Sequence, residues 1–259
     1  MTIIGTLPVI LQNGTTADAS QVMSDFNFIV NQVNANALAT SFIAPGSILA
    51  IQTFNASGTY TPNGNASKAL VFAIGGGGAG GGAGAPGLGS VLLGEGGHAG
   101  AMGMLWITAG LTSTTVTIGA AGVGNSGVAG NPGTATSFGT LMSCAGGAGG
   151  GIFGPSNQFI GVTASGPSVV TGTGNIILGL PGSLSQVPAI CISVSVFSSS
   201  PGANSAWGTG GDSVNSQSAG QASTGFGAGG GGAASANNNS NSFAGGNGRP
   251  GYMFVLEFA

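Results

Sequence analysis

The sequence predicts a mainly β protein: a short N-terminal helix, then a jelly-roll-like β-sandwich with packed glycine-rich segments of the polyglycine II type. Apolar residues recur at helical spacing only in the first 40 residues, and later apolar runs are short and strand-like. The chain holds 55 glycines in 259 residues, many of them in runs between apolar segments. Because 42% of residues are apolar and the net charge is only −3, the composition is not that of a disordered chain. We expect two parts, residues 1–45 with the helix and residues 46–259 as a glycine-rich β domain.

The helix is expected to start at Asp18, because Asp18 followed three residues later by Gln21 is a capping arrangement. Downstream apolar residues recur at steps of four, three and four, the spacing that keeps one seam of a helix against a partner. Asn36 and Thr40 occupy the next seam positions, so the seam is too short for a coiled coil that is stable alone. The seam residues are Val22, Phe26, Ile29 and Val33.

Two interpretations of this helix remain open. It can pack on its own domain as an ordinary amphipathic helix, or its seam can join several copies of the chain. Met23 and Val30 broaden the apolar stripe beyond a strict dimer seam, which favours a homotrimer or contact with a third surface.

The remainder of the chain reads as strands, with no helix signal after about residue 40. Apolar and β-branched residues gather in short runs bounded by glycine, asparagine and serine. The expected strands are residues 48–54, 59–61, 68–74, 102–108, 114–118, 134–138, 141–144 and 252–258.

The glycine runs allow three interpretations: flexible linkers, ordered irregular loops, or extended helices with three residues per turn that pack side by side. Apolar strands flank the runs and charge is almost absent from them, which favours packing over flexibility. No strict glycine period exists, so collagen is excluded. The main runs are residues 75–84, 146–151, 208–211, 225–232 and 245–248.

The near absence of charge excludes several kinds of partner. Lys68 and Arg249 are the two basic residues, too few to bind nucleic acid or an anionic membrane surface. No uninterrupted apolar run of about 18 residues exists, so membrane insertion is not expected. Cys144 and Cys191 lie far apart without neighbouring metal ligands, and buried free thiols are favoured over a disulfide.

No catalytic, cofactor or metal site is expected. His98 is the single histidine, and Glu95 three residues away is the one acid close to it in sequence. A hydrolytic triad or a zinc site needs further groups at defined positions. The run at 82–87 matches GxGxxG but opens no helix, so dinucleotide binding is rejected.

The order of landmarks resembles the glycine-rich domain of bacteriophage tail fibre and tail tip proteins over roughly residues 48–259. The landmarks are FNASGTYT at 54–61, ALVFAI running into glycines at 69–84, MLWI at 104–107, TVTIGAAG at 115–122, GTATSFG at 133–139 and GYMFVLEF at 251–258. The head, residues 5–22, is similar to the N-termini of phage tail proteins. Residues 152–206 have no counterpart in this resemblance.

The resemblance implies a structural virion protein of the phage tail that attaches by its N-terminus and contributes to binding a host receptor. Its expected partners are other copies of itself, other tail or baseplate proteins, and a host glycan or outer-membrane protein. The alternative is a surface-binding or ice-binding module with packed polyglycine segments, although threonine and alanine show no fixed period. A tail-borne depolymerase is the third and weakest interpretation.

Receptor recognition is expected where side chains interrupt the glycine frame. The segment 152–159 places two aromatic residues beside amides, a mix common at binding surfaces. Against this, residues 190–197 alternate like a half-buried strand, so the aromatic residues can equally be core. The candidate receptor-binding residues are Phe153, Asn157, Phe159, Trp207, Asn238 and Asn239.

Overall fold

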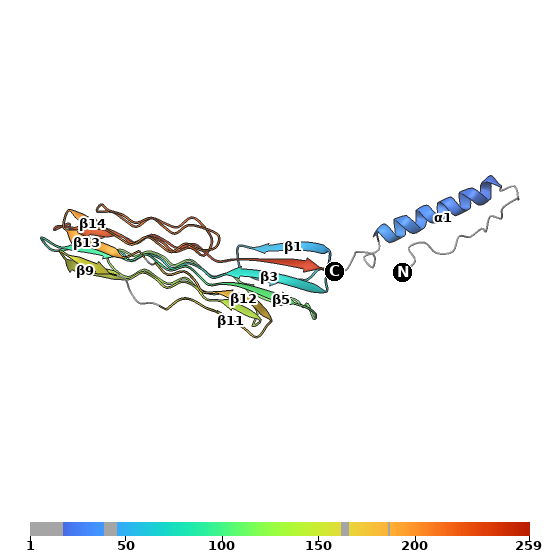
Figure 1. Cartoon of the computed structure of the whole chain (residues 1–259), viewed down its shortest axis with the longest axis horizontal. Helices are drawn as coiled ribbons and strands as arrows, with labels where there is room; N and C mark the ends of the chain where they lie inside the picture. The colour runs from blue at the N-terminus through green and yellow to red at the C-terminus, as the bar shows by residue number, and fades with distance from the viewer. Residues whose placement is uncertain (1–17, 39–45, 162–165, 186) are drawn as a thin grey trace.

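The structure is a computed structural model that describes residues 18–38, 46–161, 166–185 and 187–259. These residues form one helix, α1 (Ala19–Leu38), and an elongated β body with sheets toward both ends and extended segments between them (Figure 1). The prediction of a mainly β chain with one N-terminal helix is therefore confirmed for this part. Residues 1–17 and 39–45 of the predicted head lie outside the described residues.

Two five-stranded sheets form the end of the body near the C-terminus, and all their strand pairs are antiparallel. The first, here called the β16 sheet, has the order β1 (Ile48–Phe54), β16 (Tyr252–Phe258), β3 (Lys68–Ile74), β5 (Met102–Ile107) and β12 (Ile176–Leu180). The second, the β7 sheet, has the order β11 (Val170–Thr171), β8 (Met142–Cys144), β7 (Thr136–Phe138), β6 (Thr114–Thr117) and β2 (Gly58–Tyr60).

One hydrophobic core joins these two sheets. Alternate residues of β16 are buried, and Met253 and Val255 pack with Phe138 and Met142 of the β7 sheet. Glu257 follows in the same alternation and is also fully buried. Its Oε1 accepts a hydrogen bond from the Tyr60 hydroxyl at 2.7 Å, which ties the last strand to β2.

The opposite end of the body, here called the tip, carries two three-stranded sheets and a second core. One has the order β10 (Phe159–Gly161), β13 (Ala189–Ser193) and β14 (Val196–Ser198); the other has the order β15 (Ala234–Ala236), β4 (Val91–Gly94) and β9 (Ile152–Ser156). Val91, Leu93 and Cys191 are central members of the second core.

A bundle of glycine-rich segments connects the two ends, with residues 75–83 at its centre. The N–H groups of Gly75, Gly78 and Gly81 donate to the carbonyls of residues 101, 98 and 95 in turn. Residues 76, 79 and 82 donate likewise to a second antiparallel segment, 128–134, and residues 77, 80 and 83 to a third, 243–249. A bonding period of three is that of an extended helix with three residues per turn.

The carbonyl groups of this central segment are used in the same way. They accept from three further segments that run parallel to it: residues 147 and 150 donate to residues 76 and 79, residues 230 and 233 to residues 78 and 81, and residue 122 to residue 77. A Cβ at Gly77 would lie 2.0 Å from the Ala228 carbonyl oxygen, and one at Gly78 would lie 2.0 Å from that of Ala148. The glycine runs are thus packed segments, and glycine is required because backbone contacts backbone.

Most predicted strands are present within one or two residues of their expected ends. The structure adds β4, β9, β10, β11, β12 and β15, which the sequence did not predict, and it places β13 and β14 where alternation at 190–197 indicated a half-buried strand. The predicted strand at 134–138 is shorter, Thr136–Phe138, because Thr134 turns its Oγ1 to the N–H of Ala120 as part of the bundle.

Candidate functional site

The tip is the region where polar and apolar side chains together project beyond the glycine-rich bundle. Its loops lie side by side: the N–H of Asn237 donates to the Ser90 carbonyl at 2.8 Å, and that of Asn238 to the Gly87 carbonyl at 3.2 Å. Asn237 and Asn238 have φ of 53° and 59°, a left-handed conformation that asparagine tolerates better than most residues. The loop is therefore a defined turn and not a loose polar tail.

Three predicted recognition residues, Asn157, Asn238 and Asn239, lie at the tip. Asn157 is exposed and lines a hollow of about 330 Å³ together with Gln158 and Ile192. Asn239 donates from its amide to the Gln217 side chain, and its Oδ1 accepts the N–H of Asn241 at 3.0 Å. Asn238 is exposed beside it. Amide groups at the tip are thus available from two separate loops.

The two aromatic residues of the predicted recognition segment are part of the second core. Phe153 and Phe159 are half-buried, pack against that core and hold their ring centroids 6.3 Å apart. These surroundings favour the alternative interpretation, in which the two rings are part of the core, over a free recognition surface. Their role in recognition stays a prediction that nothing in the fold tests directly.

The sequence reasoning missed the apolar residues that the tip exposes. Ile160 is 75% exposed and Ile192 is 60% exposed, and both line a second hollow of about 420 Å³ that shares Gln158 with the first. Strand alternation was the available signal, because Phe159 and Cys191 turn inward and their neighbours must turn outward. The tip surface is consequently a mixture of aliphatic and amide groups without charge.

Trp207 lies away from the tip, against the β16 sheet. Its ring centroid is 5.4 Å from that of Tyr252 and 5.9 Å from that of Phe254. The structure therefore does not bring Trp207 together with the other candidate recognition residues.

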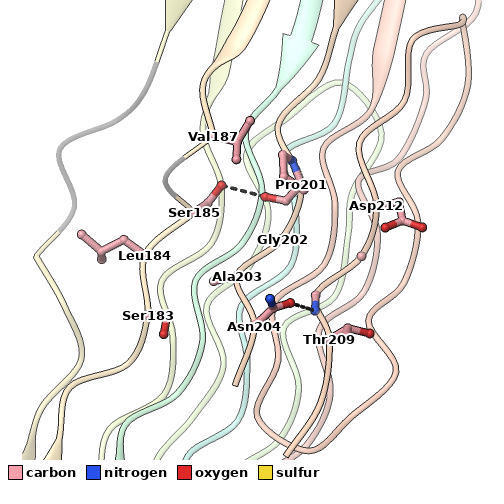
Figure 2. A pocket seen from close by; sticks show the side chains of 12 residues that line it. Ser183, Leu184, Ser185, Val187, Pro201, Gly202, Ala203, Asn204, Thr209 and Asp212 are labelled. Carbon is pink, nitrogen blue, oxygen red and sulfur yellow. Dashed lines mark hydrogen bonds between the residues drawn. The ribbon is translucent and has the colours of Figure 1, made fainter. Parts of the chain in front are cut away.

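A groove of about 610 Å³ runs along the bundle between the two ends, and Figure 2 shows its lining. The Ser185 hydroxyl donates to the Pro201 carbonyl at 2.7 Å, and the N–H of Gly210 donates to Asn204 Oδ1 at 2.8 Å. Among the described residues of the lining, Asp212 supplies the single carboxylate and no aromatic ring contributes. The groove lining presents hydroxyl, amide and backbone groups.

The histidine and both cysteine side chains are buried. His98 is 2% exposed, and neither ring nitrogen has a hydrogen-bond partner in the described part of the chain. Burial lowers the pKa of His98, although the nearby Glu95 carboxylate acts in the opposite direction. Burial raises the pKa of the Cys144 thiol to about 12 and also raises that of Cys191, and both cysteines are free. Neither thiol is a nucleophile at neutral pH.

The predicted helix seam is open to solvent in the single chain. Val22, Phe26 and Val33 are 44%, 62% and 46% exposed, and Ile29 is half-buried. At the start of α1 the N–H of Ser20 donates to Asp18 Oδ1 at 2.9 Å, so Asp18 caps the helix as its spacing predicted.

Among the described residues, no group of three or more histidine, cysteine or acidic side chains could hold a metal ion. The same residues contain no helix with the length and apolar character needed to span a membrane. No protein-family model matches this sequence, and a search of curated proteins finds no similar protein.

Proposed function

We propose that the chain is a structural component of a phage tail fibre or tail tip, which attaches to the tail through its N-terminal segment and contributes to host-receptor binding. The observation that supports the proposal is that the two ends of the body differ in structure. A backbone-bonded glycine bundle separates an end that bears α1 from an end that presents exposed loops (Figure 1). Such a spacer suits a protein that must hold on at one end and bind at the other.

The receptor-binding surface in this proposal is the tip. Ile160 and Ile192 supply apolar contact area, and Asn157 and Asn238 supply adaptable hydrogen-bonding groups beside them. Interfaces rely on buried apolar anchors surrounded by polar groups of this kind. Because the surface has no charge, we expect binding that changes little with salt, to a host glycan or an outer-membrane protein.

The remaining parts of the proposal concern assembly. The seam of Val22, Phe26, Ile29 and Val33, of which three side chains are exposed and Ile29 is half-buried, joins copies of the chain into a homotrimer. The N-terminal segment contacts other tail or baseplate proteins. The function is binding without chemistry, and the chain is located in the virion. We also propose a jelly-roll-like sandwich for the two five-stranded sheets at the β16 end.

Two experiments test this function. Immunogold labelling of intact phage particles with an antibody against the chain should mark the tail, and labelling of no part of any particle would refute a virion role. The purified chain should compete with particles for adsorption to host cells. A double variant, Ile160→Ser with Ile192→Ser, should lose that competition, whereas Val169→Ser with Ile177→Ser, which changes exposed aliphatic residues at the β16 end of the body, should retain it. Equal competition by both variants would remove the tip from the binding surface.

A further inference from the structure

The β16 sheet has a second face that is almost entirely apolar. On β16, Met253 and Val255 point into the core, so Tyr252, Phe254, Leu256 and Phe258 point to the opposite side. Their cross-strand partners continue this side onto the neighbouring strands. We call it the aromatic face, and it comprises Ile48, Ile51, Thr53, Leu70, Phe72, Met102, Met104, Trp106, Leu178, Leu180, Tyr252, Phe254, Leu256 and Phe258.

The rings of this face are packed into a fixed arrangement. Phe72 and Phe254 stack with centroids 4.4 Å apart, and Trp106 meets Phe258 edge-on at 5.5 Å. Trp207 and Phe226 add rings from the bundle, and they pack against Tyr252 and Phe254. A rigid aromatic surface binds at low entropic cost, because its side chains are ordered beforehand.

Residues 204–206 lie beside Met102 and Leu180, with which they line a hollow of about 270 Å³, but both outer strands of the sheet keep exposed apolar side chains. Ile51 is 61% exposed and Leu180 is 43% exposed, on opposite edge strands of the sheet. Lys68, beside Phe258, is the single charged residue on this side of the described strands. Apolar patches of this extent on a soluble protein mark places where another molecule packs, and sheets normally bury such a face against a second layer.

The path of the chain indicates which molecule packs on the aromatic face. The N–H of Gly46 donates to the carbonyl of Ala259, so the chain enters this sheet at the end of β16, directly after residues 39–45. From Leu38 to Gly46 the chain can span at most about 28 Å. Copies whose α1 seams associate therefore keep their aromatic faces within a short tether of each other, which raises the effective concentration into the millimolar range.

The area of the aromatic face explains why it would hold copies together only in combination with α1. Five strands about 4.8 Å apart and seven residues of about 3.4 Å outline a face of about 570 Å². A standard interface buries about 800 Å² on each partner, so the face alone is too small for stable association. A rigid and apolar face is also compatible with a copy of itself, because Lys68 at the start of β3 is its single charged residue among the described strands.

We infer that the aromatic face is covered by another copy of this chain, so that copies contact each other along their β16 sheets as well as through α1. This inference rests on the α1 association in the proposed function. It extends the contact from the head into the body. The strands of the β16 sheet run along the long axis of the body (Figure 1), so copies joined by this face would pack side by side.

Thiol labelling of the full chain gives a direct test, because its two cysteines are buried and free. Ile51→Cys places one accessible thiol on the aromatic face, and Val128→Cys, at a residue 53% exposed, places one on the bundle surface. In associated protein we expect a maleimide to react about tenfold more slowly at position 51 than at position 128. This factor corresponds to an aromatic face that is uncovered in about one copy in ten. Adding Phe26→Ser and Ile29→Ser should remove this protection.

Sedimentation provides the second measurement. Ile51→Glu with Leu180→Glu should dissociate the oligomer, whereas Val123→Glu with Val128→Glu should leave it intact, and all these residues are exposed enough for the single chain to fold. If the wild type is oligomeric but position 51 reacts as fast as position 128, the face is not an interface and α1 alone holds the copies. If the wild type is monomeric at every concentration, both the face and the α1 seam are refuted, while immunogold labelling still decides the virion role separately.

Discussion

Replacing Gly77 by alanine tests the idea that backbone contact holds the bundle together. The added Cβ would lie 2.0 Å from the Ala228 carbonyl oxygen and 2.4 Å from its carbon, whereas real Cβ atoms essentially never come within 3.0 Å of such atoms. The two segments must therefore move apart by about 1 Å, the difference between 3.0 and 2.0 Å. Neither contact is a flexible side chain that could swing aside.

The cost follows from the hydrogen bonds at this point. Gly77 donates to the Arg249 carbonyl at 2.8 Å and accepts from the N–H of Gly122 at 2.8 Å, and Arg249 donates to Ala228 at 3.0 Å. Each buried backbone group left unpaired costs about 1 to 3 kcal/mol. Two or three groups left unpaired therefore predict a decrease of about 2 to 9 kcal/mol in the free energy of unfolding, a large part of the total of about 5 to 15 kcal/mol that is typical of a domain.

Gly64→Ala is the matched control, because a Cβ at Gly64 meets nothing within 4 Å. Both variants add one methyl group and restrict the unfolded chain equally, so their difference isolates the packing of the bundle. Urea unfolding followed by far-ultraviolet circular dichroism measures both. A Gly77→Ala protein that loses less than about 1 kcal/mol, or no more than Gly64→Ala, would refute backbone packing at this position.

Three further predictions concern buried polar groups. The pKa of His98 is lower in the fold than its ordinary value, so the folded chain binds fewer protons; stability should fall as pH decreases below about 6.5, and His98→Leu should show a smaller fall over that range in urea titrations. Tyr60→Phe removes the hydroxyl that donates to Glu257 and should lower the free energy of unfolding by about 1 to 3 kcal/mol, with Tyr252→Phe as the control. Cys144 should resist iodoacetamide at pH 8 in the folded chain and react in urea, and reaction in the folded chain would contradict its burial.

The local elements could be predicted because each depends on nearby residues. Asp18 caps α1 as its spacing indicated, and the apolar run at 68–74 is a strand with the same ends. Pairing could not be predicted, since β16 lies between β1 and β3 and joins residues almost 200 positions apart. Nothing in the composition of one strand identifies such a distant partner.

The sequence predicted that the glycine runs pack, but not how they are arranged in the bundle. Flanking apolar strands indicated that the glycine runs pack, but the period of three is a property of hydrogen bonds and leaves no period in the sequence. Ala79 shows why: it lies in the central segment and is fully buried, so its Cβ finds room where a Cβ at Gly78 or Gly80 would strike a carbonyl oxygen. Whether alanine fits depends on the neighbouring segment, which the sequence of the run does not contain.

The candidate site shows the same division between local and distant information. Asn157 and Asn238 come from loops far apart in sequence, and only the fold brings them to one end. The directions of Phe159 and Ile160 were within reach of strand alternation, yet the recognition hypothesis named the aromatic residue and passed over the exposed isoleucine. Trp207 lies between glycine runs as expected, but the rings that it contacts, those of Tyr252 and Phe254, belong to the β16 sheet.

The bundle also makes the two ends of the body depend on each other. Residues 95–101 lead from β4 at the tip directly into β5 of the β16 sheet, and residues 145–151 lead from β8 into β9 in the opposite direction. Both segments bond to residues 75–83 along their length, so neither core can open without breaking buried hydrogen bonds in the bundle. Unfolding should therefore be one cooperative transition despite two separate hydrophobic cores. Side chains on the tip loops take no part in these bonds, which leaves the proposed binding surface free to vary while the backbone frame keeps its geometry.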